Sequence, residues 1–165
     1  MRRIYQTLAL LATTGLLMSG CGFKMRGADL GLPFTRIALQ GDHQVTQEIR
    51  EVLLRQPAVV ITNKPVDSQV VLIVMGQRID REVTAFNAAG RPREIQIRLR
   101  VTYRVTDGVA IEIFPPQEIM QTRDLTVNEA EILSSSIAEN FEINTMQTDI
   151  AQQILRRLRA VKLPQ

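Results

Sequence analysis

Residue types that could do covalent or metal chemistry are scarce in this sequence. There is one cysteine, Cys21, and one histidine, His43. They cannot form a metal site of ordinary ligand spacing, because such a site needs three or four ligands. We interpret His43, beside an expected helix start, as an exposed first-turn residue rather than a base. The sequence also lacks the Gly-x-Ser-x-Gly elbow and the phosphate-binding Gly-Lys-Ser/Thr motif. We therefore expect no enzyme, no metal and no cofactor.

Cys21 follows a segment with the layout of an export signal. Arg2 and Arg3 precede an apolar run, Leu8 to Met18, which is too short to span a bilayer. The segment resembles a bacterial lipobox, in which a diacylglycerol is attached to the cysteine before cleavage. We therefore expect residues 1–20 to be a cleaved signal peptide. Cys21 would then carry a diacylglycerol and an N-acyl chain (palmitate), and would anchor the protein in a membrane.

Two residues beside Cys21 refine this interpretation. Met18 stands where a lipobox usually has leucine, a residue of similar bulk. Gly22, rather than aspartate, follows the cysteine, which by the same resemblance indicates the outer membrane. The alternative is an ordinary signal peptide with an incidental cysteine. A lone cysteine in an exported chain has no disulfide partner within that chain, which favours lipid attachment.

Arginine is the main source of positive charge, with 17 arginines against 3 lysines. Without the two arginines of the signal, 18 basic residues face 17 acidic ones, a balance that indicates no nucleic-acid partner. Guanidinium groups bind phosphate through paired, charge-assisted hydrogen bonds. Arg91 and Arg93 flank Pro92 in an expected turn, where the proline restricts the backbone. They are candidate phosphate ligands, and the alternative is that both are simply solvated.

The first half of the mature chain has the pattern of a parallel crossover. A short strand is expected at 36–40, a helix capped by Asp42 through about Arg55, and a second strand at 59–61. Gly-rich residues 21–35 lead from the lipid to this point, and residues 36–165 are expected to form a single domain.

The strongest strand signal lies in the middle of the sequence. Residues 95–105 alternate between apolar and polar side chains, which predicts a strand with one buried face. Residues 70–86 form its expected antiparallel partner. Asn87 to Gly90 supplies the turn, with Gly90 favoured for a positive φ.

Charges on the polar face suggest a register for this hairpin. We expect Glu82 opposite Arg98 and Asp80 opposite Arg100. A shift of two residues would place Arg78 opposite Arg100, which like-charge repulsion disfavours.

The last third of the sequence predicts one further strand and a long helix. After a turn at Asp107–Gly108, the prolines Pro115–Pro116 are expected to break the chain before a strand at 118–125. Thr126 and Glu129 have the spacing of a capping box for a helix reaching about Val161. The apolar stripe of this helix changes phase, which predicts a kink or break near 140–144.

These elements predict an α+β fold. We expect a two-layer sandwich in which a mixed sheet of four to five strands carries two helices on one face, the C-terminal helix being long.

Taken in order, these features resemble the LPS-assembly lipoprotein family, LptE. The similar segments are the mature start Cys21–Gly27, the hairpin with Phe86 and Gly90 near its tip, and the C-terminal stretch 154–158. The resemblance covers the whole mature chain and implies a two-layer fold with helices on one side of a mixed sheet.

The resemblance also implies a function. Such a protein plugs and helps to assemble the outer-membrane β-barrel LptD as a heterodimer, and binds lipopolysaccharide during insertion into the outer leaflet. It would face the periplasm and lie within the barrel lumen. Members carry basic residues near the hairpin tip, matched here by Arg91 and Arg93, and at the start of the last helix, where Ser134–Ser136 offers no lysine.

The polar face of the hairpin could lie against the polar lumen of such a barrel. Its arginines are the candidate barrel contacts: Arg78, Arg98, Arg100 and Arg104. The alternative is that this face meets only water. Two other functions stay open: a stand-alone outer-membrane lipoprotein that binds or carries a lipid without a barrel, and a periplasmic enzyme of unrecognised type.

Overall fold

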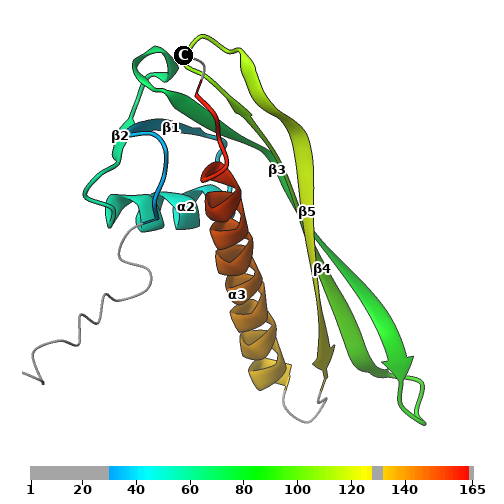
Figure 1. The fold of residues 1–165 in the computed structure, drawn as a ribbon. Helices are drawn as coiled ribbons and strands as arrows, with labels where there is room; N and C mark the ends of the chain where they lie inside the picture. The colour runs from blue at the N-terminus through cyan, green and yellow to red at the C-terminus, as the bar shows by residue number, and fades with distance from the viewer. Residues whose placement is uncertain (1–29, 128–131, 164–165) are drawn as a thin grey trace, which may run out of the picture.

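The computed structural model describes residues 30–127 and 132–163. This part of the chain contains five strands, two α-helices and one 3-10 turn, and Figure 1 shows how they are arranged. In chain order these are β1 (Arg36–Gln40), α2 (Gln44–Leu54), β2 (Val60–Thr62), η1 (Pro65–Asp67), β3 (Val70–Phe86), β4 (Pro92–Thr106), β5 (Glu112–Thr126) and α3 (Ile132–Leu158). The predicted α+β fold, a mixed sheet with two helices, is confirmed.

The five strands form one sheet in the order β2-β1-β3-β4-β5. β1 pairs in parallel with β2 and β3, while β3, β4 and β5 pair antiparallel. The three long strands extend well beyond β1, β2 and α2, and α3 runs back alongside them (Figure 1). The molecule therefore has a compact end, around α2, and a narrow end, at the β3–β4 turn.

The β1–α2–β2 unit is the parallel crossover that the sequence predicts. Its helix starts differently, because Asp42 is not the cap. The N-cap is His43, which makes no side-chain cap hydrogen bond. The backbone N–H of Val45 instead donates to Oε1 of Gln77, on β3, over 3.1 Å. Helix amides need acceptors at the N-terminus, and here one comes from a neighbouring strand.

The β3–β4 hairpin closes with the predicted turn. Gly90 has a φ of +75°, a value that glycine adopts without steric cost. Oδ1 of Asn87 accepts hydrogen bonds from the backbone N–H groups of Ala89 and Arg91. The turn is thus ordered by the asparagine side chain as well as by the glycine.

The predicted register of this hairpin is wrong by two residues. Arg78 lies opposite Arg100, and Asp80 lies opposite Arg98. The repulsion expected for this register is relieved because Asp80 lies between the two arginines. Its carboxylate is 2.7 Å from Nε of Arg78 and 3.5 Å from Nη2 of Arg100. Glu82 still pairs with Arg98, but diagonally rather than directly across the strands.

The last strand begins earlier than predicted. β5 starts at Glu112 and passes through Pro115–Pro116 instead of beginning after them. The pairing with β4 is irregular at this point, where Tyr103 pairs with Gln117 but Val105 pairs with Phe114. Proline lacks an N–H group, yet it is tolerated in an edge strand and at a bulge. Both conditions hold here, since β5 is the edge of the sheet.

The C-terminal helix is continuous. α3 runs without interruption through residues 140–144, so the predicted break is not found there. The predicted cap is also wrong, because Thr126 is the last residue of β5, and Glu129 lies outside the described residues. The helix ends at Leu158, slightly before the predicted Val161.

The core lies between the sheet and the two helices. Both helices, β1 and one face of the long strands contribute fully buried side chains: Ile37, Val45, Ile49, Leu53, Val70, Leu72, Ile97, Leu99, Val101, Tyr103, Met146, Ile150, Ile154 and Leu158. The opposite face of the long strands carries mostly polar side chains. We call the part formed by β3, β4 and β5 the open sheet face. Among the described helices, none is long and apolar enough to cross a bilayer.

Candidate interaction surfaces

The open sheet face carries the four arginines that the sequence marks as candidate barrel contacts. Arg78, Arg98, Arg100 and Arg104 share this face because their neighbours at 99, 101, 103 and 105 point into the core. The structure thus brings the four together on one surface. Arg104 is exposed and makes no ion pair among the described residues.

The other three arginines of this face are paired with acids. Arg98 Nη2 lies 2.5 Å from Oε2 of Glu82, and Asp80 is shared by Arg78 and Arg100. The side chain of Arg78 is 75% exposed, so its pair lies in water and contributes little to folding stability. The face therefore presents three arginines held in ion pairs and a fourth, Arg104, whose charge a partner could pair.

Arg91 and Arg93 lie at the narrow end of the molecule. Arg91 belongs to the β3–β4 turn, and Arg93 follows the first residue of β4. Their backbones are fixed by hydrogen bonds: Asn87 N–H donates to the carbonyl of Arg91, and Val127 N–H to that of Arg93, both at 2.8 Å. The two candidate phosphate ligands are thus held close to the end of β5, and both are exposed.

A second group of arginines, beyond those marked by the sequence, connects the sheet to α3. Nε of Arg81, on β3, pairs with Oε1 of Glu139 on α3. Arg123, on β5, pairs with Asp149 at 3.2 Å and Glu142 at 3.7 Å. Arg81 and Arg123 lie directly opposite Ile97 on its two sides and so share the helix-covered face. The sequence signal for such contacts is a charged residue at a strand position where the alternation predicts an apolar one.

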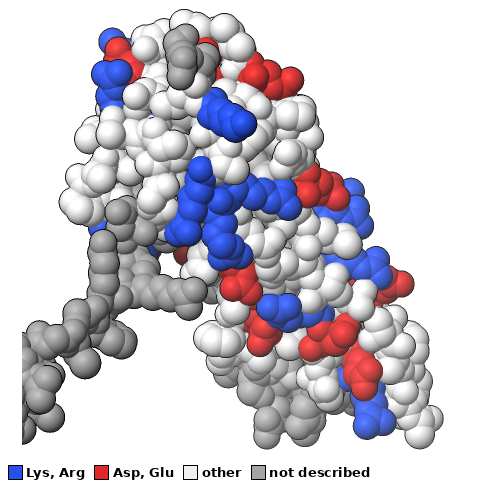
Figure 2. Space-filling model, viewed as in Figure 1, with Lys and Arg blue, Asp and Glu red and all other residues white. Residues whose placement is uncertain are grey.

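Arg157 makes a similar contact at the other end of α3. Its Nη1 donates to the hydroxyl of Tyr103 over 3.1 Å and to Oε1 of Gln117 over 3.0 Å. The Tyr103 hydroxyl in turn donates to the same Gln117 oxygen. Figure 2 shows basic side chains gathered near the C-terminal end of α3, with basic and acidic ones alternating toward the narrow end.

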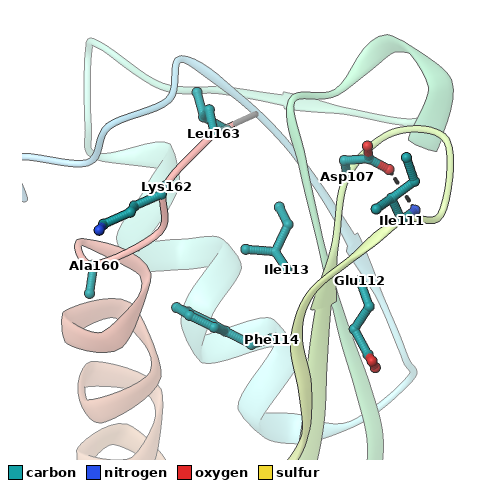
Figure 3. A pocket seen from close by; sticks show the side chains of 8 residues that line it. All are labelled: Asp107, Ile111, Glu112, Ile113, Phe114, Ala160, Lys162 and Leu163. Atoms are coloured by element: carbon teal, nitrogen blue, oxygen red, sulfur yellow. Dashed lines mark hydrogen bonds between the residues drawn. The ribbon is translucent and has the colours of Figure 1, made fainter. Parts of the chain in front are cut away.

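Two hollows lie between the strands and the C-terminal part of the chain, where side chains do not fill the space. The larger, about 550 Å³, lies between the start of β5 and the segment after α3. Ile113 and Phe114 point into this gap, and Oδ1 of Asp107 accepts a hydrogen bond from Ile111 N–H at its edge (Figure 3). The smaller, about 290 Å³, lies between the ends of the long strands and the start of α3. Neither hollow is predicted by the sequence, because neither depends on a motif.

In the described part of the chain, no three His, Cys, Asp or Glu residues are grouped closely enough to hold a metal ion. Cys21, the expected lipid attachment site, lies outside the described residues.

Solved structures of bacterial lipoproteins share this fold. The solution structure of uncharacterized lipoprotein B from Nitrosomonas europaea is 28% identical with a TM-score of 0.72, covering 84% of this chain and 91% of that one. Rare lipoprotein B from Shewanella oneidensis is 21% identical with a TM-score of 0.66, covering 76% and 95%. A minor lipoprotein from Acinetobacter baumannii is 22% identical with a TM-score of 0.62, covering 81% and 98%.

No curated protein matches the sequence. The LptE family model, described as lipopolysaccharide-assembly, matches residues 34–158, which span the domain from just before β1 to the end of α3. The match covers most of the chain and agrees with the architecture of the sheet and helices. This chain therefore belongs to the LptE lipopolysaccharide-assembly family.

Proposed function

We propose that this protein plugs the lumen of an LptD-type outer-membrane β-barrel and contacts lipopolysaccharide during its insertion into the outer leaflet. The observation that carries the proposal is the open sheet face. It presents ordered charges, and Asp80 and Glu82 pair with three of its four arginines. Such a face can lie against a polar barrel wall with three arginines already paired, so that the wall needs to supply a partner only for Arg104, because an unpaired buried charge would be costly.

The membrane attachment in this proposal is the lipid on Cys21. Two or more acyl chains hold a protein stably at a membrane, whereas one gives only reversible binding. A diacylglycerol and an N-acyl chain on Cys21 would therefore keep the domain at the periplasmic surface of the outer membrane. The domain could then enter the barrel from that side.

The lipopolysaccharide contact in this proposal is the narrow end, where Arg91 and Arg93 lie. The lipid A phosphates are suitable ligands because a guanidinium group can donate two parallel hydrogen bonds to a phosphate. Both arginines are exposed, and hydrogen bonds fix their backbones. The second basic position of the family, at the start of α3, has no lysine in this chain.

Co-purification from outer membranes in mild detergent tests this function. An affinity-tagged full chain should recover a large β-barrel in a one-to-one ratio. A Cys21→Ser chain, expressed equally, serves as the control for membrane attachment and should recover much less. Recovery of the lipidated wild-type chain from outer membranes without any barrel would instead favour the stand-alone lipid-binding lipoprotein.

A further inference from the structure

The smaller hollow has the form of an apolar cleft at the narrow end of the molecule. We call it the tip cleft, and its volume is about 290 Å³. The strands contribute Val83, Ile95 and Leu125 to its wall, and α3 contributes Ser135, Ser136 and Ala138. Pro92, Thr126, Val127 and Glu139 complete the lining.

The cleft exists because α3 places small side chains opposite the apolar ends of the strands. Ser135, Ser136 and Ala138 are too short to fill the space above Val83 and Leu125. Among the side chains that the structure describes, Ile143 is the first of α3 to be buried. Near the cleft, the ion pair between Glu139 and Arg81 joins α3 to the strands, one turn before the buried Ile143.

Positive charge lies beside this cleft. Pro92 lines it, and Arg91 and Arg93 are the neighbours of Pro92 in the chain. The carbonyl of Arg93 accepts a hydrogen bond from Val127, another lining residue. An apolar hollow whose lining residue Pro92 is flanked in the chain by two exposed arginines is complementary to an amphiphile with an acyl chain and an anionic headgroup.

We propose that the tip cleft binds one acyl chain of a phosphate-bearing lipid, with the phosphate near Arg93. The proposal rests on the lipopolysaccharide contact proposed above and extends it from the headgroup to the chain. The size is suitable: a water molecule occupies about 30 Å³ of liquid, and a methylene group is similar, so the cleft holds roughly ten methylenes. An acyl chain of ordinary length would fill the cleft, and its remainder would project from it.

Charge distinguishes this cleft from the larger cavity at the other end of the molecule. That cavity is lined by Asp107 and Glu112 together with Lys162, whereas the one charged residue among the described residues that line the tip cleft, Glu139, is paired with Arg81. An anionic lipid is disfavoured in the larger cavity by like-charge repulsion. The larger cavity therefore provides a matched control. It is also hollow and partly apolar, but its acidic lining residues would repel the phosphate of the lipid.

Tryptophan fluorescence can test the proposal, because the sequence contains no tryptophan. A Ser136→Trp chain would report on the tip cleft, and an Ile111→Trp chain on the larger cavity. Each full chain is kept in a steroid-based detergent, which has no alkyl chain to compete for the cleft. The probe is a lysophosphatidic acid whose single acyl chain is brominated, because bromine quenches tryptophan at short range.

We expect the probe to quench the Ser136→Trp emission by at least half and the Ile111→Trp emission several-fold less. Adding Val83→Phe, which narrows the cleft, should abolish most of the quenching in the Ser136→Trp chain. Thermal unfolding of each variant verifies that the fold is retained. Equal quenching at both reporters, or none at Ser136→Trp, would overturn the proposal.

A separate binding measurement with lipopolysaccharide distinguishes this inference from the proposed function. If lipopolysaccharide binds the wild-type chain but the brominated chain does not quench Ser136→Trp, the contact is limited to the headgroup and the tip cleft proposal fails alone. If lipopolysaccharide does not bind but the probe quenches selectively, the cleft binds acyl chains and the lipopolysaccharide assignment fails. Glycerol phosphate, which has the headgroup and no chain, should not displace the probe from the cleft.

Discussion

Arginine has two distinct structural roles in this protein. On the open sheet face, Arg98 and Arg100 are held by acids of the neighbouring strand. On the covered face, Arg81 and Arg123 reach from the sheet to acids on α3. The guanidinium group suits both, because it is weakly hydrated and donates several hydrogen bonds in a plane.

Arg91 and Arg93 allow a residue-scale test of the lipopolysaccharide contact. Replacing both with glutamate should weaken lipopolysaccharide binding by at least tenfold, because two phosphate donors become repulsive carboxylates. Binding of the purified double variant is the measurement. A chain with Arg156→Glu and Arg159→Glu, which makes the same charge change on exposed residues in the last turn of α3 and just after it, is the control. Equal affinities in the two variants would place the contact elsewhere.

Leu99 and Thr102 test which face of the sheet is the core face. Leu99 is fully buried under the helices, whereas Thr102 is only partly buried on the open sheet face. Leu99→Ala should lower the free energy of unfolding by about 2–5 kcal/mol through cavity formation. Thr102→Ala should lower it by less than about 1 kcal/mol. Urea denaturation measures both, and similar losses would contradict a sheet covered on one side only.

At the scale of elements, α3 is attached to the sheet in two ways. Beyond Ile143 it buries a regular apolar stripe that includes Met146 and Ile150. Before that point, ion pairs such as that between Glu139 and Arg81 join the described side chains of the helix to the strands. The phase change of the apolar stripe therefore marks a change in what the helix contacts and not a break in the helix.

This division predicts unequal effects of substitutions along α3. Ile150→Ala should lower the free energy of unfolding by about 2–5 kcal/mol, because Ile150 is fully buried. Arg123→Gln should cost at most about 1 kcal/mol, because its side chain is 41% exposed and its pairs are screened by water. Chemical denaturation measures both values. A larger loss for Arg123→Gln would mean that ion pairs dominate the attachment.

At the scale of the whole molecule, the surfaces proposed to contact the barrel and the lipid lie at different places. The compact end holds the parallel unit, whereas the narrow end holds Arg91, Arg93 and the tip cleft. Between them the open sheet face runs along the long strands. An elongated shape of this kind suits a plug whose side meets a barrel wall and whose tip meets a lipid.

Arg104 offers a whole-molecule test of the barrel contact. It is exposed on the open sheet face and makes no ion pair among the described residues, so its charge can be reversed without leaving an acid unpaired. Arg104→Glu should lower recovery of the barrel by roughly tenfold, a change of about 1.4 kcal/mol. Arg156→Glu, on an exposed residue of α3, is the matched control. Unchanged recovery of the barrel with Arg104→Glu would argue against this face as the contact.

The sequence by itself determined which elements form and which faces they bury. The alternation at 95–105 predicted the buried face of β4, and Gly90 predicted the turn that precedes it. Both signals are local, because a side chain's face in a strand depends only on its position along that strand. The ordered motifs from Cys21 to Leu158 also sufficed to indicate the family.

Only the tertiary structure decided how these elements meet. The hairpin register depended on where Asp80 lies between Arg78 and Arg100, a balance of cross-strand terms of about 0.2–1 kcal/mol each, which a simple rule of opposite charges cannot resolve. The first turn of α2 is satisfied by Gln77, which is distant in the sequence. The tip cleft likewise exists only because small side chains of α3 come to lie over apolar strand ends. Each of these three features depends on groups that are distant in the sequence and come together only on folding. A local sequence pattern therefore cannot predict them.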